Sequence, residues 1–237
     1  DFYIACYTIG RQVYSSRYDL DSLSPMQRRQ YFEGIYSAGR QYIQANKGEY
    51  GEIITRPTDR RENYVKRCVG LPGQTLQIKD RIIYLDGKAN KEPDNVQYTY
   101  HVKLKQSLND DLMKELGISM EDLMSLNTTG VMPLTKRAVE VFKSRHDLVE
   151  SISLNTDASD IEIYPLNGNK HWTRDNYGPV WIPAKGKSIK LTLDNLPIYE
   201  RPIRAYEKNK LEVRDGKIFI NGNQTDQYTF KMDYYWM

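Results

Sequence analysis

The fold of this chain is decided by the stretch Tyr64-Val65-Lys66-Arg67-Cys68-Val69-Gly70-Leu71-Pro72-Gly73-Gln74. Its apolar and aromatic residues predict a strand that runs directly into a Gly-Leu-Pro-Gly turn. Two cations, Lys66 and Arg67, stand in the middle of that strand. Because side chains alternate along a strand, these two residues point to opposite faces and need separate explanations.

A lysine in such a strand has two interpretations. If its face is buried, the loss of water lowers the pKa of a lysine amine from about 10.4, the value of the free side chain. An amine lowered by several units can act as a general base. If the lysine lies at a strand edge, its amine reaches water and its role is structural. The strand pattern alone does not choose between the two.

The stretch closely resembles the lysine box of bacterial type I signal peptidases, whose pattern is Tyr-[Ile/Val]-Lys-Arg-x-Val-Gly-Leu-Pro-Gly. The match runs from Tyr64 to Gly73, and Asp86-Gly87 closes the following strand. Upstream, residues 51–57 resemble the family's Gly-Asp-[Ile/Val]-[Ile/Val]-x-x-x-Pro strand, with Glu52 in place of the aspartate. The resemblance implies a mainly β fold, in which an antiparallel sheet or barrel forms the core and carries a smaller α+β insertion.

The same resemblance implies a membrane-anchored serine endopeptidase that removes signal peptides from secreted preproteins through a Ser–Lys dyad. Lys66 would be the catalytic general base, and Arg67 would pair with the aspartate of a C-terminal Gly-Asp-Asn-Arg box. Gly70 and Gly73 would support the site, because they permit backbone geometry that a Cβ would obstruct. The implied partners are preproteins and the cytoplasmic membrane, reached through upstream helices, with the catalytic domain on the outer face. No cofactor, metal or nucleic acid is implied.

The family's nucleophile box, Pro-Ser-x-Ser-Met-x-Pro-Thr, is absent from this sequence. Its nearest imitation is residues 22–26, where Ser24 is better explained as a helix N-cap. Pro25 suits the first helical position, and Gln27 completes a capping box for a helix that runs to about Asn46. We therefore expect the serine to lie outside these 237 residues and the chain to be inactive alone.

Both ends of the sequence agree with that expectation. Phe2–Tyr7 predicts a strand at the very start, and Tyr234–Met237 is the run that leads into the Gly-Asp-Asn-Arg box in the family. We expect the catalytic domain to be cut at both ends. One alternative is a non-catalytic signal-peptidase-like binding module, in which the missing serine box is native. Another Ser–Lys enzyme, such as a self-cleaving repressor-type protease, would lack the Gly-Leu-Pro-Gly turn.

The composition sets outer limits. The 237 residues allow one large domain or two small ones, and a net charge of +3 excludes a strongly basic nucleic-acid binder. No apolar stretch approaches the ~20 residues that span a bilayer. Cys6 and Cys68 leave the compartment open; Cys68 is predicted to be a small core residue, and whether the two pair is not determined. The three histidines are scattered and form no metal-ligand pattern.

An internal repeat organises the rest of the chain. Residues 76–87 align without gaps with residues 211–222, and each copy is a strand, a turn, a second strand and an Asp-Gly or Asn-Gly pair. A Gln-Tyr-Thr-aromatic sequence follows both copies. The copies are predicted to be equivalent β-hairpins, through duplication or through convergent hairpin sequences.

Between the copies the pattern changes to β-α-α-β-α-β, which predicts a small α+β insertion. The expected elements are a strand at 98–104, helices at 108–116 and 119–126, a strand at 130–134, a helix at 135–144 and a strand at 149–154. Asn109 and Ser119 are the predicted helix caps. Residues 172–186 return to turn-rich β sequence. The predicted organisation is a core at 1–97 and 166–237, interrupted by the insertion at 98–165.

Overall fold

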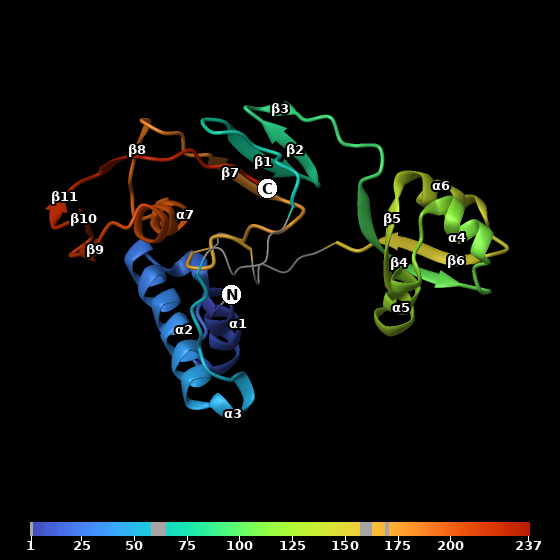
Figure 1. The fold of residues 1–237 in the computed structure, drawn as a ribbon, viewed down its shortest axis with the longest axis horizontal. Helices are drawn as coiled ribbons and strands as arrows, with labels where there is room; N and C mark the ends of the chain where they lie inside the picture. The colour runs from blue at the N-terminus through green and yellow to red at the C-terminus, as the bar shows by residue number, and fades with distance from the viewer. Residues whose placement is uncertain (1, 58–64, 157–162, 169–170) are drawn as a thin grey trace. The chain divides into compact units, whose positions relative to one another are not determined.

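The computed structural model describes residues 2–57, 65–156, 163–168 and 171–237. They divide into two compact units (Figure 1). The core unit comprises Asp1–Ala89 and Ser159–Met237, and the inserted unit comprises Asn90–Ala158. Every strand pair in the described residues is antiparallel. The predicted class, an antiparallel β core with a smaller α+β insertion, is confirmed.

The first strand that the sequence predicts is wrong, because Phe2–Tyr7 belongs to the helix α1 (Phe2–Val13). This helix packs along α2 (Pro25–Ala45) to form a helical hairpin (Figure 1). A Cβ at Gly10 would collide with the carbonyl oxygen of Ile35, and one at Gly39 would collide with that of Cys6. These two glycines let the helix backbones touch, and that packing overrides the β-preference of an aromatic run.

The start of α2 follows the predicted capping box. The Gln27 side chain accepts a hydrogen bond from the Ser24 backbone at 3.0 Å, and the Gln27 backbone donates to the Ser24 hydroxyl at 3.4 Å. Pro25 is the first residue of the helix. The N-cap interpretation of Ser24 is confirmed. Two short helices flank α2, namely η1 (Leu20–Ser22) and α3 (Lys47–Tyr50).

Among the described residues, three small sheets form the β part of the core unit. The first has the order β3-β2-β1-β7, the second β11-β10-β9, and the third pairs β12 with β8. The bounds of these strands are β1 Thr75–Lys79, β2 Ile82–Leu85, β3 Lys88–Ala89, β7 Tyr177–Trp181, β8 Ser188–Lys190, β9 Leu211–Arg214, β10 Lys217–Ile220, β11 Asn223–Gln224 and β12 Gln227–Thr229. A strand over 51–57, suggested by the family pattern, is not formed, since these residues are exposed and irregular.

The repeated sequences form equivalent hairpins, as predicted. β1 pairs with β2 in the same register as β9 pairs with β10. In the first copy the Thr75 amide donates to the Asp86 carboxylate at 2.8 Å, and in the second the Lys210 amide donates to the Asn221 side chain at 2.9 Å. The same side-chain contact therefore closes both copies, because Asp and Asn share the acceptor oxygen that the turn requires.

The segment after β8 contains a helix that the sequence analysis did not predict. It consists of α7 (Leu196–Arg201) and one turn of π-helix, η3 (Pro202–Tyr206). Leu196, Tyr199 and Ile203 recur at helical spacing and are buried in one apolar cluster with residues of β9, β10 and β12. Their burial under these strands stabilises a helix in a region whose turn residues favour irregular structure.

The inserted unit contains the six elements that the sequence predicts. They are β4 (Gln97–Leu104), α4 (Asp110–Leu116), α5 (Met120–Thr129), β5 (Val131–Thr135), α6 (Lys136–Ser144) and β6 (Val149–Leu154). The sheet has the order β5-β4-β6. The predicted caps are formed, since Asn109 accepts from the Leu112 amide at 2.9 Å and Ser119 accepts from the Asp122 amide at 3.1 Å.

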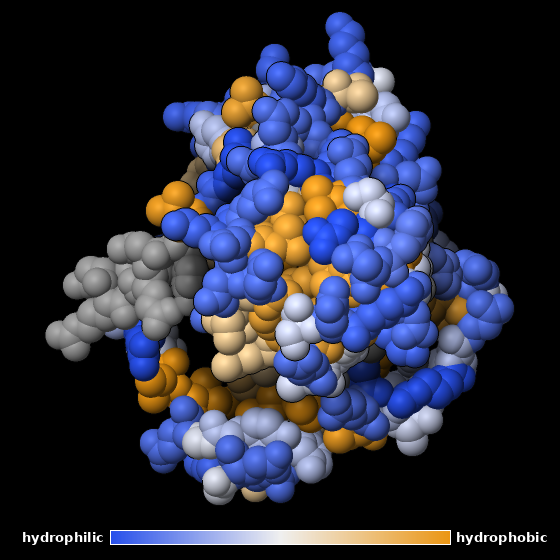
Figure 2. All heavy atoms as spheres, turned by 90° about the vertical axis from the view of Figure 1, so that its right-hand side faces the viewer, coloured by the Kyte–Doolittle hydropathy of each residue, from blue (hydrophilic) through white to orange (hydrophobic). Residues whose placement is uncertain are grey.

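Side chains of alternate polarity explain how the inserted unit packs. Met132, Leu134 and Phe142 are buried in its core, whereas His101 and Lys103 lie exposed on β4. The face of the molecule in Figure 2 is mostly hydrophilic, with a hydrophobic patch near its centre and further hydrophobic residues toward its lower edge and upper part. In the described part of the chain, no helix is both long enough and apolar enough to cross a membrane.

Candidate functional site

The Gly-Leu-Pro-Gly sequence forms a tight turn. The Gln74 amide donates to the carbonyl oxygen of Leu71 at 3.1 Å, and the Leu71 amide donates to the Gln74 side chain at 2.9 Å. Pro72 occupies the second turn position and Gly73 the third, with φ +87°. This is the arrangement of a type II turn, in which the third position favours glycine.

The turn is fixed against the end of β7. The Gly73 amide donates to the carbonyl of Ile182 at 2.8 Å, and the Ile182 amide donates to the carbonyl of Gln74 at 2.8 Å. The indole N–H of Trp181 donates to the Gly73 carbonyl at 3.1 Å. Three hydrogen bonds therefore place this turn relative to the sheet.

Gly70 joins the turn to the last described strand segment. It forms an antiparallel bridge with Trp236, and the Val69 amide also donates to the Trp236 carbonyl, at 2.8 Å. Gly70 is buried, and a Cβ there would collide with the Ile182 side chain and lie 3.2 Å from the Cβ of Trp236. Only glycine fits this site without displacing a neighbour.

Lys66 does not lie in a strand, which corrects the sequence prediction. Residues 65–68 are irregular and exposed, and Val65 is 97% exposed. Tyr64 lies outside the described residues. Among the described residues, backbone pairing of this segment starts at Val69. A strand requires a neighbouring backbone to satisfy its N–H and C=O groups, and the amino acid pattern by itself does not provide one. Lys66 and Arg67 are therefore exposed side chains that precede a fixed turn.

The two cysteines are free and lie in different environments. Cys68 was predicted to be a core residue, but it is exposed, because it belongs to the irregular segment before the bridge. Cys6 is buried at the contact of α1 and α2. Burial raises the pKa of the Cys6 thiol, while the charge of Arg40 and a hydrogen bond with Tyr36 act in the opposite direction. Cys6 is a protonated packing residue.

Glu207 fixes the segment that leads to the bridge, and sequence reasoning missed it. Its carboxylate accepts hydrogen bonds from the amides of Lys231 and Met232, at 2.9 and 3.2 Å. It also accepts from the hydroxyls of Tyr228, at 2.5 Å, and Tyr234, at 3.3 Å. Burial and the neighbouring carboxylate raise the pKa of Tyr228. A lone glutamate in a charged segment carries no sequence signal for this role.

A mostly apolar cavity of about 210 Å³ lies beside the same segment. Its lining includes Trp236 and Ile182, which also contact Gly70, and the aromatic rings of Tyr164 and Tyr199. The hydroxyl of Tyr199 donates to the Trp181 carbonyl at 3.2 Å, so this polar group is satisfied and the wall stays apolar. A cavity of this kind suits apolar groups.

A metal centre has no support in the described part of the chain. No three side chains of His, Cys, Asp or Glu lie together there in a way that could hold an ion.

Comparison with known proteins identifies the family. The family described as "Signal peptidase, peptidase S26" matches residues 3–132, which is more than half of the chain and includes the segment from Lys66 to Gly73. The chain belongs to the signal peptidase S26 family. The resemblance drawn from the lysine box to bacterial type I signal peptidases is thereby confirmed.

Individual relatives of the S26 family share shorter segments with this chain. Signal peptidase I of Bacillus licheniformis is 45% identical over 49 residues, which are 19% of this chain and 26% of the relative. Signal peptidase IB of Staphylococcus aureus is 33% identical over 58 residues, which are 24% of this chain and 29% of the relative. The chain thus spans less than a third of these curated relatives. No solved structure matches it.

Proposed function

We propose that this chain is the lysine-bearing part of a membrane-anchored serine endopeptidase that removes signal peptides from secreted preproteins, with Lys66 as the general base. Membership of the S26 family supports a peptidase. The observation that carries the proposal is that the family match covers Lys66 within the lysine box, next to the turn that Gly70 joins to Trp236. The turn and the Gly70–Trp236 bridge fix the backbone that follows Lys66, and we propose that its amine faces the serine hydroxyl.

The proposed reaction uses a serine hydroxyl and the Lys66 amine. The hydroxyl attacks the scissile carbonyl of the preprotein while the uncharged amine takes its proton, and the same proton then passes to the leaving amine. Because the family's nucleophile box does not occur in residues 1–237, we assign the serine to a different segment of the enzyme. Burial of Lys66 under that segment and the substrate would favour the uncharged amine.

Arg67 has a separate role in this proposal. The Gly70–Trp236 bridge is antiparallel, so any strand that continued in register beyond Met237 would run beside Cys68 and Lys66. An aspartate in that strand, as in the family's Gly-Asp-Asn-Arg box, would come within reach of Arg67. The ion pair between Arg67 and this aspartate would stabilise the backbone around Lys66.

The proposed substrate is the cleavage region of a signal peptide, bound in extended form. Residues 65–68 are exposed and precede the Gly70–Trp236 bridge, and we propose that an extended peptide pairs with them as a strand. The apolar cavity beside Trp236, of about 210 Å³, would accept apolar side chains of the substrate. We place the enzyme at the cytoplasmic membrane, with this domain on the outer face, where preproteins emerge.

A second candidate is a non-catalytic binding module. The absence of the serine box from the sequence favours it. Such a module would bind preproteins through the same exposed segment and would not hydrolyse them.

The deciding experiment measures preprotein cleavage and preprotein binding by the full-length protein and its Lys66→Ala variant. The peptidase proposal expects cleavage that the substitution removes, with binding retained. A full-length protein that binds preproteins but cleaves none would establish the binding module instead.

A further inference from the structure

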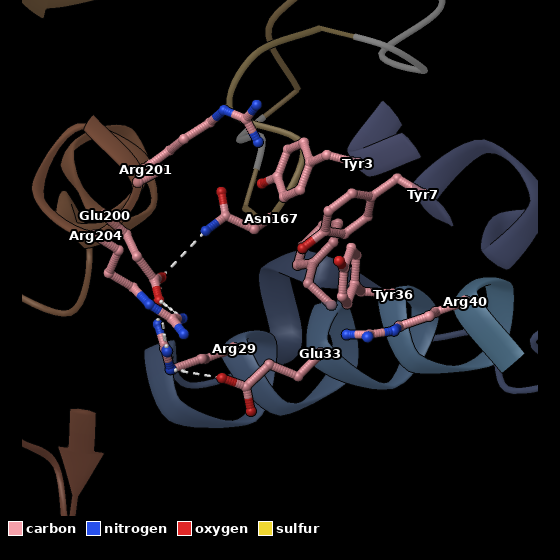
Figure 3. Close-up of a pocket in the computed structure, with 12 residues that line it drawn as sticks. Tyr3, Tyr7, Arg29, Glu33, Tyr36, Arg40, Asn167, Glu200, Arg201 and Arg204 are labelled. Atoms are coloured by element: carbon pink, nitrogen blue, oxygen red, sulfur yellow. Dashed lines mark hydrogen bonds and ion pairs between the residues drawn. The ribbon is translucent and has the colours of Figure 1, made fainter. Parts of the chain in front are cut away.

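A second cavity lies away from the Lys66 segment, within the core unit. It has a volume of about 500 Å³ and opens between the helical hairpin and the α7–η3 segment (Figure 3). Its walls come from α1, α2, the loop at Asn167, α7 and η3. Cavities of this size hold small molecules. The proposed peptidase reaction gives this cavity no role.

Three tyrosines form an aromatic wall of the cavity. The ring centroids of Tyr3 and Tyr7 are 5.2 Å apart, those of Tyr3 and Tyr36 are 5.8 Å apart, and those of Tyr7 and Tyr36 are 5.3 Å apart. Burial raises the pKa of Tyr7, so its phenol stays protonated. Figure 3 shows the hydroxyl of Tyr3 directed toward Asn167. The wall therefore offers flat apolar rings and hydroxyl donors together.

A buried ionic cluster forms the opposite side. The carboxylate of Glu200 accepts two hydrogen bonds from Arg29, at 2.8 and 3.1 Å, and one from Arg204, at 2.9 Å. The Asn167 amide donates to it at 3.3 Å. Burial alone would raise the pKa of Glu200, but the two guanidinium groups lower it. Glu200 is thus ionised and its acceptor capacity is used within the cluster.

The lining as a whole carries an excess of positive charge. Four arginines and two glutamates line the cavity, which gives a net charge of +2. Glu33 already pairs with Arg29 at 3.0 Å, as Glu200 does. A ligand that brings negative charge would offset this excess.

Arg201 is placed to meet such a charge. Its guanidinium carbon lies 4.2 Å from the ring centroid of Tyr3, and stacking of this kind fixes the guanidinium plane. Figure 3 shows Arg201, Tyr3 and Asn167 around the same part of the cavity. Planar guanidinium donors beside a hydroxyl donor suit an anion with several acceptor oxygens, such as a phosphate group.

We propose that this cavity binds a phosphate-bearing small molecule, with the phosphate against Arg201 and a flat part of the molecule against the tyrosine rings. The phosphate oxygens accept from the guanidinium and the Tyr3 hydroxyl. The flat part packs on rings in an offset or edge-to-face manner. The phosphate can belong to a soluble compound or to a lipid headgroup, and these two sources are separated by experiment.

Calorimetric titration of the full chain with phenyl phosphate tests the proposal. Phenyl phosphate should bind saturably, inorganic phosphate more weakly, and phenol not at all, because only the first combines an anion with a ring. The source of the phosphate is identified by repeating the titration with phenyl phosphate in the presence of vesicles that contain phosphatidylglycerol, and of vesicles of phosphatidylcholine alone. Competition by the anionic vesicles assigns the site to a lipid headgroup, and lack of competition assigns it to a soluble compound. Equal binding of phenol and phenyl phosphate, or no saturable binding, would overturn the proposal.

Variants locate the binding site. Arg201→Gln should weaken phenyl phosphate binding about tenfold, since a charge-assisted hydrogen bond is lost. Arg201→Lys keeps the charge and should retain part of the affinity for phenyl phosphate. This variant keeps the proposal testable if Arg201→Gln does not fold. Arg214→Gln is the matched control, because Arg214 stacks on Phe219 at 4.1 Å and does not line this cavity. Equal weakening by Arg201→Gln and Arg214→Gln would contradict the assignment.

Discussion

Gly70 and Trp236 donate one backbone hydrogen bond to each other, at 3.2 Å from the Gly70 amide and 3.0 Å from the Trp236 amide. This pair ties the turn of the lysine box to the end of the described chain. The same Trp236 carbonyl also accepts from Val69 at 2.8 Å. The position of Lys66 therefore depends on a contact between segments that are distant in sequence.

The first prediction concerns Gly70 itself. Gly70→Ala should lower the free energy of unfolding by about 1–3 kcal/mol, because the added methyl collides with the Ile182 side chain and crowds Trp236. Urea denaturation measures the change. Gly48→Ala is the matched control, since nothing lies within 4 Å of its Cβ position in α3 and the substitution should not destabilise. Unchanged stability in Gly70→Ala would mean that the bridge is not formed in solution.

The second prediction concerns the proposed general base. In the full-length enzyme, Lys66→Ala should lower turnover by about 10²–10⁴-fold, which is the usual contribution of a general base. Lys66→Arg should fail as severely, because a guanidinium does not deprotonate in a protein. Both variants should keep their melting temperature, since Lys66 is exposed. Lys88→Arg, an exposed lysine of β3, serves as the control. Wild-type turnover in Lys66→Arg would rule out Lys66 as the base.

The third prediction is that residues 1–237 alone do not cleave a signal-peptide substrate, because the nucleophile box is absent from them. Incubation at high concentration with such a peptide, followed by mass spectrometry, measures cleavage. If specific cleavage occurs and is lost when one serine within these residues is replaced, the nucleophile lies in this chain and the proposal must change.

The fourth prediction concerns Glu207. Glu207→Gln replaces one acceptor oxygen by a donor, so it leaves at least one of the bonds from Tyr228 or the 231–232 amides unmade. The loss should cost about 1–3 kcal/mol of stability. Glu212→Gln is the control, because that half-buried residue of β9 pairs with Lys210 and Arg214 at the surface. If both variants have the same urea midpoint, Glu207 does not hold the segment before Trp236.

The fifth prediction is a pH dependence that arises at Glu200. Although burial alone would raise the pKa of Glu200, its pairs with Arg29 and Arg204 lower it below the ordinary value of 4.5. A carboxyl group with a lowered folded-state pKa contributes stability above its unfolded pKa and loses it as the pH falls further. Stability should therefore decline below about pH 4.3. In Glu200→Gln the stability at pH 7 should be lower and the decline in acid shallower. An equally steep acid decline in the variant would assign it to other groups.

Local features of this protein were predictable because they depend on neighbours in sequence. The capping box at Ser24 needs only Pro25 and Gln27, and it forms as predicted. The two repeated hairpins were predictable from their turn residues. The helices and strands of the inserted unit were predictable from the spacing of their apolar residues. The lysine box likewise indicated the S26 family from a run of ten residues.

The errors share one physical cause. Phe2–Tyr7 has the composition of a strand, but contact with α2 at Gly39 makes it a helix. Residues 65–68 alternate like a strand, but they form none, and the hydrogen bonds to Trp236 begin only at Val69. A segment whose secondary structure depends on contact with a distant segment cannot be predicted from its own sequence, because that sequence does not identify the distant segment.

The sequence by itself therefore determined the family, the helix caps, the hairpins and the residue proposed as the base. Only the tertiary structure decided the helical hairpin, the hydrogen bonds of Glu207 to the segment before Trp236, and the cavity lined by tyrosines and arginines. That cavity joins Tyr3, Asn167 and Arg201, which no local pattern connects. The effects of burial and of neighbouring charges depend on which residues are in contact. For residues that are distant in sequence, those contacts are known only from the three-dimensional structure.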